Sequence, residues 1–207
     1  MKYDKKAWMR RLAERTDLSS QLVHLTREQE GKSVNEMLYE IISSGELQGS
    51  TTKSGFVCGK KIAVCFQDAP LISVCQNVFY EQKKIELDKS EKLRYRAVGI
   101  AVYKHYAYKK GARPVFYEET EMAKSILPMD QWWRIVNLNL HNESSIIDWT
   151  HEREWRLPGN FEFDISEVTL IFVSSQSFKT FLKLCKKNSK NYIHEVKGVV
   201  VMDNLLY

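Results

Sequence analysis

The sequence predicts an α+β fold in which helices flank a mixed β-sheet. Stretches with the apolar pattern of strands interleave irregularly with stretches of helical spacing, whereas a doubly wound parallel sheet would alternate strand and helix regularly. The chain has 207 residues, of which 43% are hydrophobic and 28% are charged. These values are typical of a globular protein with one sizeable core, and we expect residues 1–207 to form a single domain.

Three helices and three strands are predicted in the first half of the chain from their apolar spacing and end signals. Ser33 can cap the second helix while Glu36 returns a hydrogen bond, and Gly45 stops that helix. Pro70 opens the third helix, because proline suits the first helical turn. The order is a basic helix at 5–15 within an N-terminal segment 1–17, a strand at 21–27, the helix between the caps at 33 and 45, a polar loop at 49–60, a strand at 61–66, a helix from 70 to about 80, a charged connector at 85–93 and a strand at 95–104.

The second half predicts shorter strands and three further helices. Runs of β-branched and aromatic residues favour the strands, and apolar residues at helical spacing predict the helices. The order is a strand at 112–117, helices at 119–126 and 129–140, strands at 154–158, 161–163 and 168–175, a basic amphipathic helix at 177–187 and a final strand at 195–203.

Composition narrows the choice of partners and compartment. Lys and Arg total 31 against 26 Asp and Glu, and the resulting charge of +5 favours an anionic partner without identifying it. No apolar run approaches the roughly 20 residues that a membrane span needs. The charged N-terminus does not resemble a signal peptide. We therefore expect a cytoplasmic protein without membrane segments.

Several classes of enzyme lack their sequence signatures here. The four cysteines form no CxxC pair and have no histidines at metal-ligand spacing, so we expect reduced thiols and no metal site. The sequence contains no GxGxxG, no GxxxxGK[ST], no GxSxG and no HExxH motif. This argues against dinucleotide-binding dehydrogenases, P-loop enzymes, serine hydrolases and zinc proteases.

The stretch HEREWR (residues 151–156) carries the strongest candidate for chemistry. On a strand, Glu152 and Glu154 would share one face, and two nearby carboxylates raise at least one pKa unless cations compensate. Arg153 and Arg156 are near enough in sequence to do so. A catalytic carboxylate in a partly dry pocket and a solvated, ion-paired strand are both consistent with these residues.

Two other strand ends carry polar groups. In LVHLTR, His24 and Thr26 point to one side and could contact a ribose or an amide, while Arg27 could bind a phosphate. Taken alone, a histidine such as His24 is more often structural than a ligand contact. In VCFQDAP, the strand ends at Asp68, which could line a cleft or cap the next helix. The basic helix at 177–187 could be a solvated face or a nucleic-acid patch.

The ordered motifs LVHLTR, IISSGEL, AVCFQDAP, YRAVGIAV, GARPVFY and DWTHEREWRLPG resemble AbiGi-type abortive-infection proteins of phage defence. More remotely they are similar to DarT-type ADP-ribosyltransferase toxins, which modify nucleic acid. The closer resemblance covers roughly residues 20 to 175. It implies an ADP-ribosyltransferase-like fold with a split mixed sheet, and NAD, as a substrate, in the cleft.

The resemblance also assigns roles. Glu154 would be catalytic, and Glu152, the first glutamate of an ExE motif, would orient or deprotonate the acceptor. The residues implied in NAD binding are His24 and Thr26 on the first strand, Arg27, Arg153 or Arg156 at the pyrophosphate, and Phe66 or Tyr103 stacked on a ring. A DarT-type arginine after the first helix has no counterpart, since that region offers Lys53, Lys60 and Lys61.

These implications lead to one expected function and two alternatives. We expect an NAD-dependent ADP-ribosyltransferase that acts as a toxin or phage-defence effector on nucleic acid or protein, with a possible antitoxin partner. The first alternative is a catalytically inactive scaffold that serves as a sensor or partner-binding component. The second is a nucleic-acid-binding module that acts through the helix at 177–187.

Overall fold

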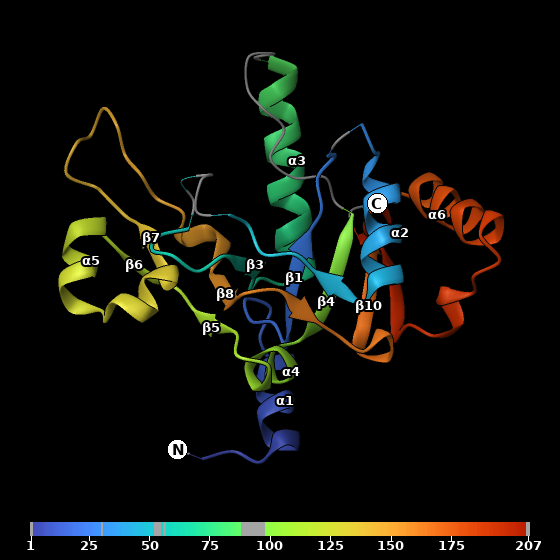
Figure 1. Ribbon diagram of the computed structural model, residues 1–207, viewed down its shortest axis with the longest axis horizontal. Coiled ribbons are helices and arrows are strands. Elements are labelled where there is room, and N and C mark those ends of the chain that lie inside the picture. Colours follow the sequence, from blue (N-terminus) through green and yellow to red (C-terminus); the bar gives the residue numbers. More distant parts are fainter. Residues whose placement is uncertain (1, 30, 52–54, 56, 88–97, 206–207) are drawn as a thin grey trace. The chain divides into compact units, whose positions relative to one another are not determined.

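The computed structural model describes residues 2–29, 31–51, 55, 57–87 and 98–205. It is a mixed α+β structure with helices flanking a mixed sheet (Figure 1). The chain divides into two compact units. The first comprises Met1–Glu46, Ala69–Tyr103 and Phe163–Tyr207, and the second comprises Leu47–Asp68 and Lys104–Glu162. That residues 1–207 form a single domain stays a prediction.

The first unit contains four sheet strands in the order β11-β10-β4-β1. β1 (Gln21–Leu25) and β10 (Val168–Phe172) each pair with β4 (Gly99–Tyr103) in antiparallel fashion, and β11 (Gly198–Val201) pairs with β10 in parallel. Every residue of β10 is buried. The central strands are therefore apolar on both faces, as expected for a sheet covered on both sides.

Four helices accompany these strands: α1 (Lys5–Ala13), α2 (Val34–Ser44), α3 (Leu71–Leu87) and α6 (Ser175–Lys187). The predicted capping box is present, since Ser33 accepts a hydrogen bond from the Glu36 N–H and Glu36 accepts one from the Ser33 N–H. Gly45 ends α2 with a left-handed backbone (φ 68°), as predicted. α2 and α6 lie side by side (Figure 1), joined by a buried hydrogen bond from Ser177 to Asn35.

The second unit contains the strand order β3-β8-β5. β3 (Ala63–Gln67) and β5 (Arg113–Pro114) both pair in antiparallel fashion with β8 (Glu154–Pro158). A separate parallel pair joins β6 (Phe116–Glu118) to β7 (Ile135–Asn137). The remaining elements of this unit are α4 (Lys104–Lys109), α5 (Thr120–Ile126), η2 (Met129–Arg134), η3 (Thr150–Glu152) and β9 (Phe161–Glu162). The two residues of β2 (Glu46–Leu47) are divided between the units. The first unit also contains the 3-10 turns η4 (Ile165–Glu167), η5 (Tyr192–His194) and η6 (Met202–Leu205).

Several predicted elements differ from the structure in type or extent. The strand predicted at 168–175 ends at Phe172, and the strand predicted at 195–203 is β11 followed by a 3-10 turn, η6 (Met202–Leu205). The helix at 129–140 is a 3-10 turn, η2, followed by β7, because Ile135 and Val136 are β-branched and pair with β6. The strand at 112–117 is divided into β5 and β6. The strand at 95–104 ends at Tyr103, where α4 begins, and its first residues lie outside the described ones.

Parts of two other predicted segments also lie outside the described residues. The third helix continues beyond the predicted end to Leu87, and residues 88–93 of the predicted connector are not described. In the predicted loop at 49–60, residues 52–54 and 56 are not described. Among the described residues, no helix has the length and apolarity that crossing a membrane requires.

Candidate functional site

A tight turn leads the chain into β8. The Asp148 carboxylate accepts hydrogen bonds from the Thr150 N–H (2.8 Å) and hydroxyl (2.7 Å), and these bonds start η3. The Thr150 hydroxyl, more than the backbone, lowers the pKa of Asp148. η3 ends at Arg153, whose φ of 45° and ψ of 51° are left-handed. A non-glycine residue in this region is strained by about 1 kcal/mol or more.

This turn corrects the expected geometry of the two glutamates. The strand begins at Glu154, whereas Glu152 ends the 3-10 helix before it. The two therefore do not share one strand face, because the left-handed Arg153 stands between them. Both are nevertheless buried, with 9% of Glu152 and 8% of Glu154 exposed.

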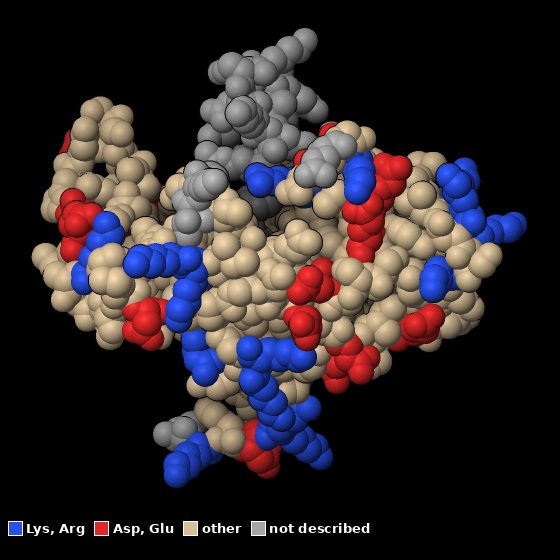
Figure 2. All heavy atoms as spheres, in the orientation of Figure 1, with Lys and Arg blue, Asp and Glu red and all other residues tan. Residues whose placement is uncertain are grey.

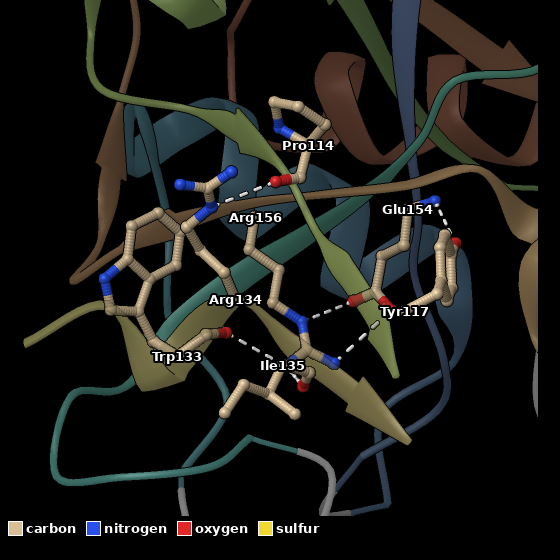
Figure 3. A network of polar contacts seen from close by, with 7 residues as sticks. All are labelled: Pro114, Tyr117, Trp133, Arg134, Ile135, Glu154 and Arg156. Carbon is tan, nitrogen blue, oxygen red and sulfur yellow. Dashed lines mark hydrogen bonds and ion pairs between the residues drawn. The ribbon is translucent and has the colours of Figure 1, made fainter. Parts of the chain in front are cut away.

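Hydrogen bonds hold the backbone of Glu154 on both sides, and Figure 3 shows the one to Tyr117. Its N–H donates to the Tyr117 hydroxyl at 2.7 Å, and its carbonyl accepts from the Val115 N–H at 3.1 Å. Burial, more than the neighbouring carboxylates, raises the pKa of Tyr117 to about 12. Tyr117 therefore remains a neutral hydroxyl at physiological pH.

The side chain of Glu154 forms an ion pair with Arg156 on the same strand (Figure 3). Arg156 donates from Nε to Oε1 at 2.7 Å and from Nη2 to Oε2 at 3.3 Å. This two-pronged contact fixes the plane of the carboxylate as well as its position. Residues 151–156 predicted that Arg156 could compensate the charge of a nearby glutamate. It does so for Glu154, in a buried ion pair.

Two backbone carbonyls complete the surroundings of Arg156. Its Nη1 donates to the carbonyls of Trp133 and Ile135, both at 3.0 Å. Burial acts to lower the pKa of Arg156, but the charge of the Glu154 carboxylate and its hydrogen bond act in the other direction, and the net effect is a raised pKa. Arg156 is therefore charged although only 3% of it is exposed.

The neighbouring strand contributes Cys65 and Gln67. In the β3–β8 register Cys65 lies opposite Arg156 and Gln67 lies opposite Glu154. Burial, reinforced by the Glu154 carboxylate, raises the pKa of Cys65 far above its usual range, so it is a neutral thiol. Gln67 is 7% exposed, and its Oε1 has no hydrogen-bond partner among the described residues. An unsatisfied buried acceptor is unusual and marks a place where a donor can bind.

The opposite face of β8 carries a second set of polar contacts. Trp155 donates from Nε1 to Oδ2 of Asp68 at 3.1 Å, and Lys104 pairs with Oδ1 of Asp68 at 2.7 Å. The Asp68 N–H donates to the Arg153 carbonyl at 3.2 Å. Asp68 therefore ties the end of β3 to the start of β8 and to α4.

The predicted NAD-binding residues are divided between the units. His24, Thr26, Arg27 and Tyr103 belong to the first unit, and Phe66, Arg153 and Arg156 belong to the second with both glutamates. The structure thus brings together Glu154 and Arg156, and it places the LVHLTR residues in the other unit.

Several of these residues already have structural contacts. Both the N–H and the hydroxyl of Thr26 donate to the Val98 carbonyl at 2.8 Å. Phe66 is 1% exposed and packs edge-on against Phe161 at 5.3 Å between ring centroids. The Lys197 ammonium lies over the ring of Tyr103, 4.5 Å from the ring centroid. Arg27 is exposed.

Sequence reasoning missed the supporting groups of the site. Tyr117, Lys104 and the carbonyls of Trp133 and Ile135 come from distant parts of the chain, and nothing in their local spacing marks them. The adjacent tryptophans at 132 and 133 were a signal of a packed segment, but not of a backbone acceptor for Arg156.

Two hollows occur in the first unit, and none of the residues that line them is a predicted site residue. One of about 440 Å³ lies at the end of α6 and is lined by Leu182, Cys185, Lys186, Ser189, Lys190, Asn191, Ile193 and His194. The other, of about 400 Å³, is lined by Glu28, Gln29, Gly31, Lys32 and Ser33. In the described part of the chain, no group of three or more His, Cys, Asp or Glu side chains is arranged to hold a metal ion.

The chemical capacity of the site rests on one oriented carboxylate. Glu154 is held by a fixed cation in surroundings that exclude most water, where an anion acts strongly on a nearby positive charge. No protein-family model matches the chain, and no significant similarity to a curated protein or to a solved structure is found.

Proposed function

We propose that the protein is an NAD-dependent ADP-ribosyltransferase with an ADP-ribosyltransferase-like fold and with Glu154 as its catalytic residue. The observation that supports this best is the buried Glu154 carboxylate at the first position of β8, held by both prongs of Arg156. A late strand that opens with a glutamate is also the feature that the sequence resemblance implies.

Glu154 suits the charge that develops in this reaction. The bond between nicotinamide and ribose breaks with its electron pair going to the nicotinamide nitrogen, which leaves as a neutral ring. Positive charge then builds on the ribose, as in glycoside hydrolysis, and an aligned carboxylate stabilises it. The acceptor attacks the anomeric carbon and loses a proton, for which Glu152 is the proposed base.

The pairing of Glu154 with Arg156 is compatible with this role. An ionised carboxylate has about four lone-pair positions, and Arg156 uses one on each oxygen. A ribose hydroxyl could therefore donate to Glu154 without displacing the guanidinium. The unsatisfied Oε1 of Gln67, on the strand position opposite Glu154, offers a further acceptor for a substrate hydroxyl or amide.

The residues that the resemblance names for NAD binding remain part of this proposal. His24 and Arg27 contact the ribose and the pyrophosphate, with Thr26, Arg153, Arg156, Phe66 and Tyr103 as the further positions that the resemblance names. The biological role proposed is that of a cytoplasmic toxin or phage-defence effector with nucleic acid as acceptor, restrained by an antitoxin.

Labelled NAD tests the proposal directly. The protein is incubated with NAD carrying label on the adenosine, together with nucleic acid or cell lysate, and nicotinamide release and label transfer are measured. Glu154→Gln keeps the size of the side chain and removes its charge, so we expect at least a roughly 100-fold loss of nicotinamide release, the scale of removing one electrostatic stabiliser. Glu143→Gln, at an exposed loop position, is the matched control and should behave as the wild type.

Two results would reject the proposal. One is the absence of nicotinamide release from the wild-type protein, and the other is release that Glu154→Gln leaves unchanged.

The catalytically inactive scaffold is the second candidate, and one observation favours it. Each oxygen of Glu154 already accepts a hydrogen bond from Arg156, so the carboxylate has a structural role without a substrate, and the arginine of DarT-type proteins has no counterpart in this chain. Titration calorimetry with NAD separates the two candidates. An enzyme binds NAD, whereas a scaffold without a usable cleft gives no heat of binding.

A further inference from the structure

The surface formed by α4 and β5 combines cations with exposed aromatic rings. It lies in the stretch KHYAYKKGARP (residues 104–114), which contains Lys104, Lys109, Lys110 and Arg113 but no acidic residue. Figure 2 shows how Lys and Arg side chains are distributed over one face of the molecule. We call residues 104–113 and Trp155 the α4 surface.

Three side chains of the α4 surface form a stack. The Arg113 guanidinium lies 3.8 Å from the centroid of the Tyr108 ring, and Tyr108 meets Trp155 edge-on at 6.5 Å. Half of Tyr108 is exposed to solvent. The stack therefore offers flat π-surface at the outside of the molecule.

Hydrogen bonds and an ion pair hold the side chains of this stack in place. Trp155 is fixed by its hydrogen bond to Asp68, which is fixed in turn by its ion pair with Lys104. Arg113 is anchored from Nη1 to the carbonyls of Tyr108 and Ala112 at 2.9 and 2.7 Å. Because the rings are already ordered, a ligand that stacks on them loses little of its affinity to their immobilisation.

The positive charge of the α4 surface is largely uncompensated. Lys104 is neutralised by Asp68, but Lys109, Lys110 and Arg113 form no ion pair with any other described residue. Lys109 and Lys110 are exposed. Among the described residues, Arg113 donates hydrogen bonds from Nη1 alone, so its other guanidinium edge faces no protein acceptor there.

We propose that the α4 surface binds single-stranded nucleic acid. Lysines and the open edge of Arg113 contact phosphates, while a base stacks on the exposed part of Tyr108 or on the Arg113 plane. An acidic peptide would use the charges but not the stacked rings. A duplex would use the charges but keep its bases stacked on each other and out of reach of Tyr108.

This surface deepens the proposed function by naming single-stranded nucleic acid as the acceptor class, and in that respect it rests on the proposed function. The binding itself needs no NAD. It is measured without NAD, so the failure of transferase activity and the failure of the docking surface give different results.

Fluorescence anisotropy with a labelled oligothymidylate and oligouridylate tests the proposal in the full-length protein. We expect Tyr108→Ala to weaken binding roughly tenfold, the scale of losing one stacked base. Tyr108→Phe should bind as the wild type, because it keeps the ring. The double variant Lys109→Ala/Lys110→Ala should lower the slope of log affinity against log salt by about 0.7 per lysine removed.

Matched controls come from the rest of the chain. Lys183→Ala/Lys186→Ala removes the same charge from the exposed face of α6, and Tyr80→Ala removes a tyrosine that is 62% exposed on α3. Both should leave affinity within about twofold of the wild type apart from the general effect of charge on salt dependence. Circular dichroism confirms that each variant is folded.

Three outcomes would overturn the proposal. They are an affinity that Tyr108→Ala does not change, competition by polyglutamate as strong as that by oligothymidylate, and a loss of affinity from the α6 variant equal to that from the α4 variant. The last would assign nucleic-acid binding to α6, the alternative that the sequence raised.

Discussion

Arg156 has only 3% of its surface exposed, and its burial depends on the four hydrogen bonds that it donates. A buried ion pair is costly to desolvate, so its net contribution to stability is small or negative compared with an apolar pair of the same size. Removing one partner is a different matter, because the remaining charge is then buried alone. The Glu154–Arg156 pair should therefore behave as one unit.

Arg156→Met should lower the free energy of unfolding by about 3–5 kcal/mol, the usual cost of leaving a buried charge unpaired. Urea unfolding followed by circular dichroism measures this. The double variant Glu154→Gln/Arg156→Met should recover most of the loss, since no ionised group of the pair remains buried. Arg134→Met, which loses one hydrogen bond to the Pro114 carbonyl, is the control and should cost about 1 kcal/mol. A double variant as unstable as the single one would contradict this account.

Tyr117 provides a pH-dependent contribution with a defined sign. Its pKa is about 12 in the folded protein against a usual value of 10.0, with burial as the first cause. The folded state therefore holds the proton more tightly than the unfolded state, and the contribution is fully present below pH 10 and is lost as pH rises to about 12.

Measuring unfolding free energy across this pH window in wild type and in Tyr117→Phe isolates the effect. The wild type should lose more stability than the variant over the window, because phenylalanine does not ionise. Parallel curves for wild type and Tyr117→Phe would show that Tyr117 ionises equally in both states.

The arrangement of the polar residues in the site could be predicted only in part from the sequence. Glu154 and Arg156 stand two apart, so strand periodicity alone predicts that they share a face and can pair. The left-handed Arg153 was not predictable, because most arginines avoid that conformation and local spacing does not signal it. Tyr117 was not predictable as a partner of Glu154 either, since the chain separates them by 37 residues.

At the scale of elements, the sequence correctly predicted a helix whose two ends are set by residues close to it in the chain. α2 has its cap, its returning glutamate and its stop within thirteen residues, and all three act as expected. The 129–140 segment failed because its apolar spacing suits a helix while its β-branched residues pair with β6, and pairing with a distant strand overrides local preference.

Gly99 in β4 is required by a close approach of two strands. A Cβ at this position would lie 2.0 Å from the carbonyl oxygen of His24 and 2.9 Å from Cα of Leu25. The backbone of β1 would have to move, and the hydrogen bonds from Thr26 to the adjacent Val98 carbonyl would be distorted with it.

We therefore expect Gly99→Ala to lower the free energy of unfolding by about 3 kcal/mol or more, at the upper end of overpacking effects. Chemical denaturation measures it. Gly198→Ala in β11 is the control, because its Cβ would meet only the Thr169 hydroxyl oxygen at 4.0 Å, and it should change stability by less than about 1 kcal/mol. Equal stability of the two variants would contradict the steric argument.

At the scale of the whole molecule, composition and element order predicted the α+β class but not its division. The first unit is assembled from three separate stretches of chain and the second from two. Periodicity reports which elements exist, and it carries no information about which distant stretches share a core. Which stretches share a core depends on pairing between strands that are distant in the chain. β4, for example, pairs with β10 across more than sixty positions.

The last stretch supplies part of the core of the first unit. Ile171 and Met202 pack in one apolar cluster with Val23, Val74 and Ala101. A chain that ends at Asp164 lacks β10, α6 and β11, so β4 loses its neighbour on one side and this cluster loses two members. Amide hydrogens of β1 and β4 should then exchange much faster than in the full chain, as mass spectrometry can measure. Retained protection of β4 in the shortened chain would show that β10 is dispensable.

The place of β10 in the sheet also has a consequence for synthesis. β4 is translated some seventy residues before its neighbour β10, and until that neighbour leaves the ribosome one edge of β4 has unpaired backbone groups and an uncovered apolar surface. Such edges recruit other chains. The nascent chain therefore presents an unpaired strand edge and an uncovered apolar surface until β10 has been made.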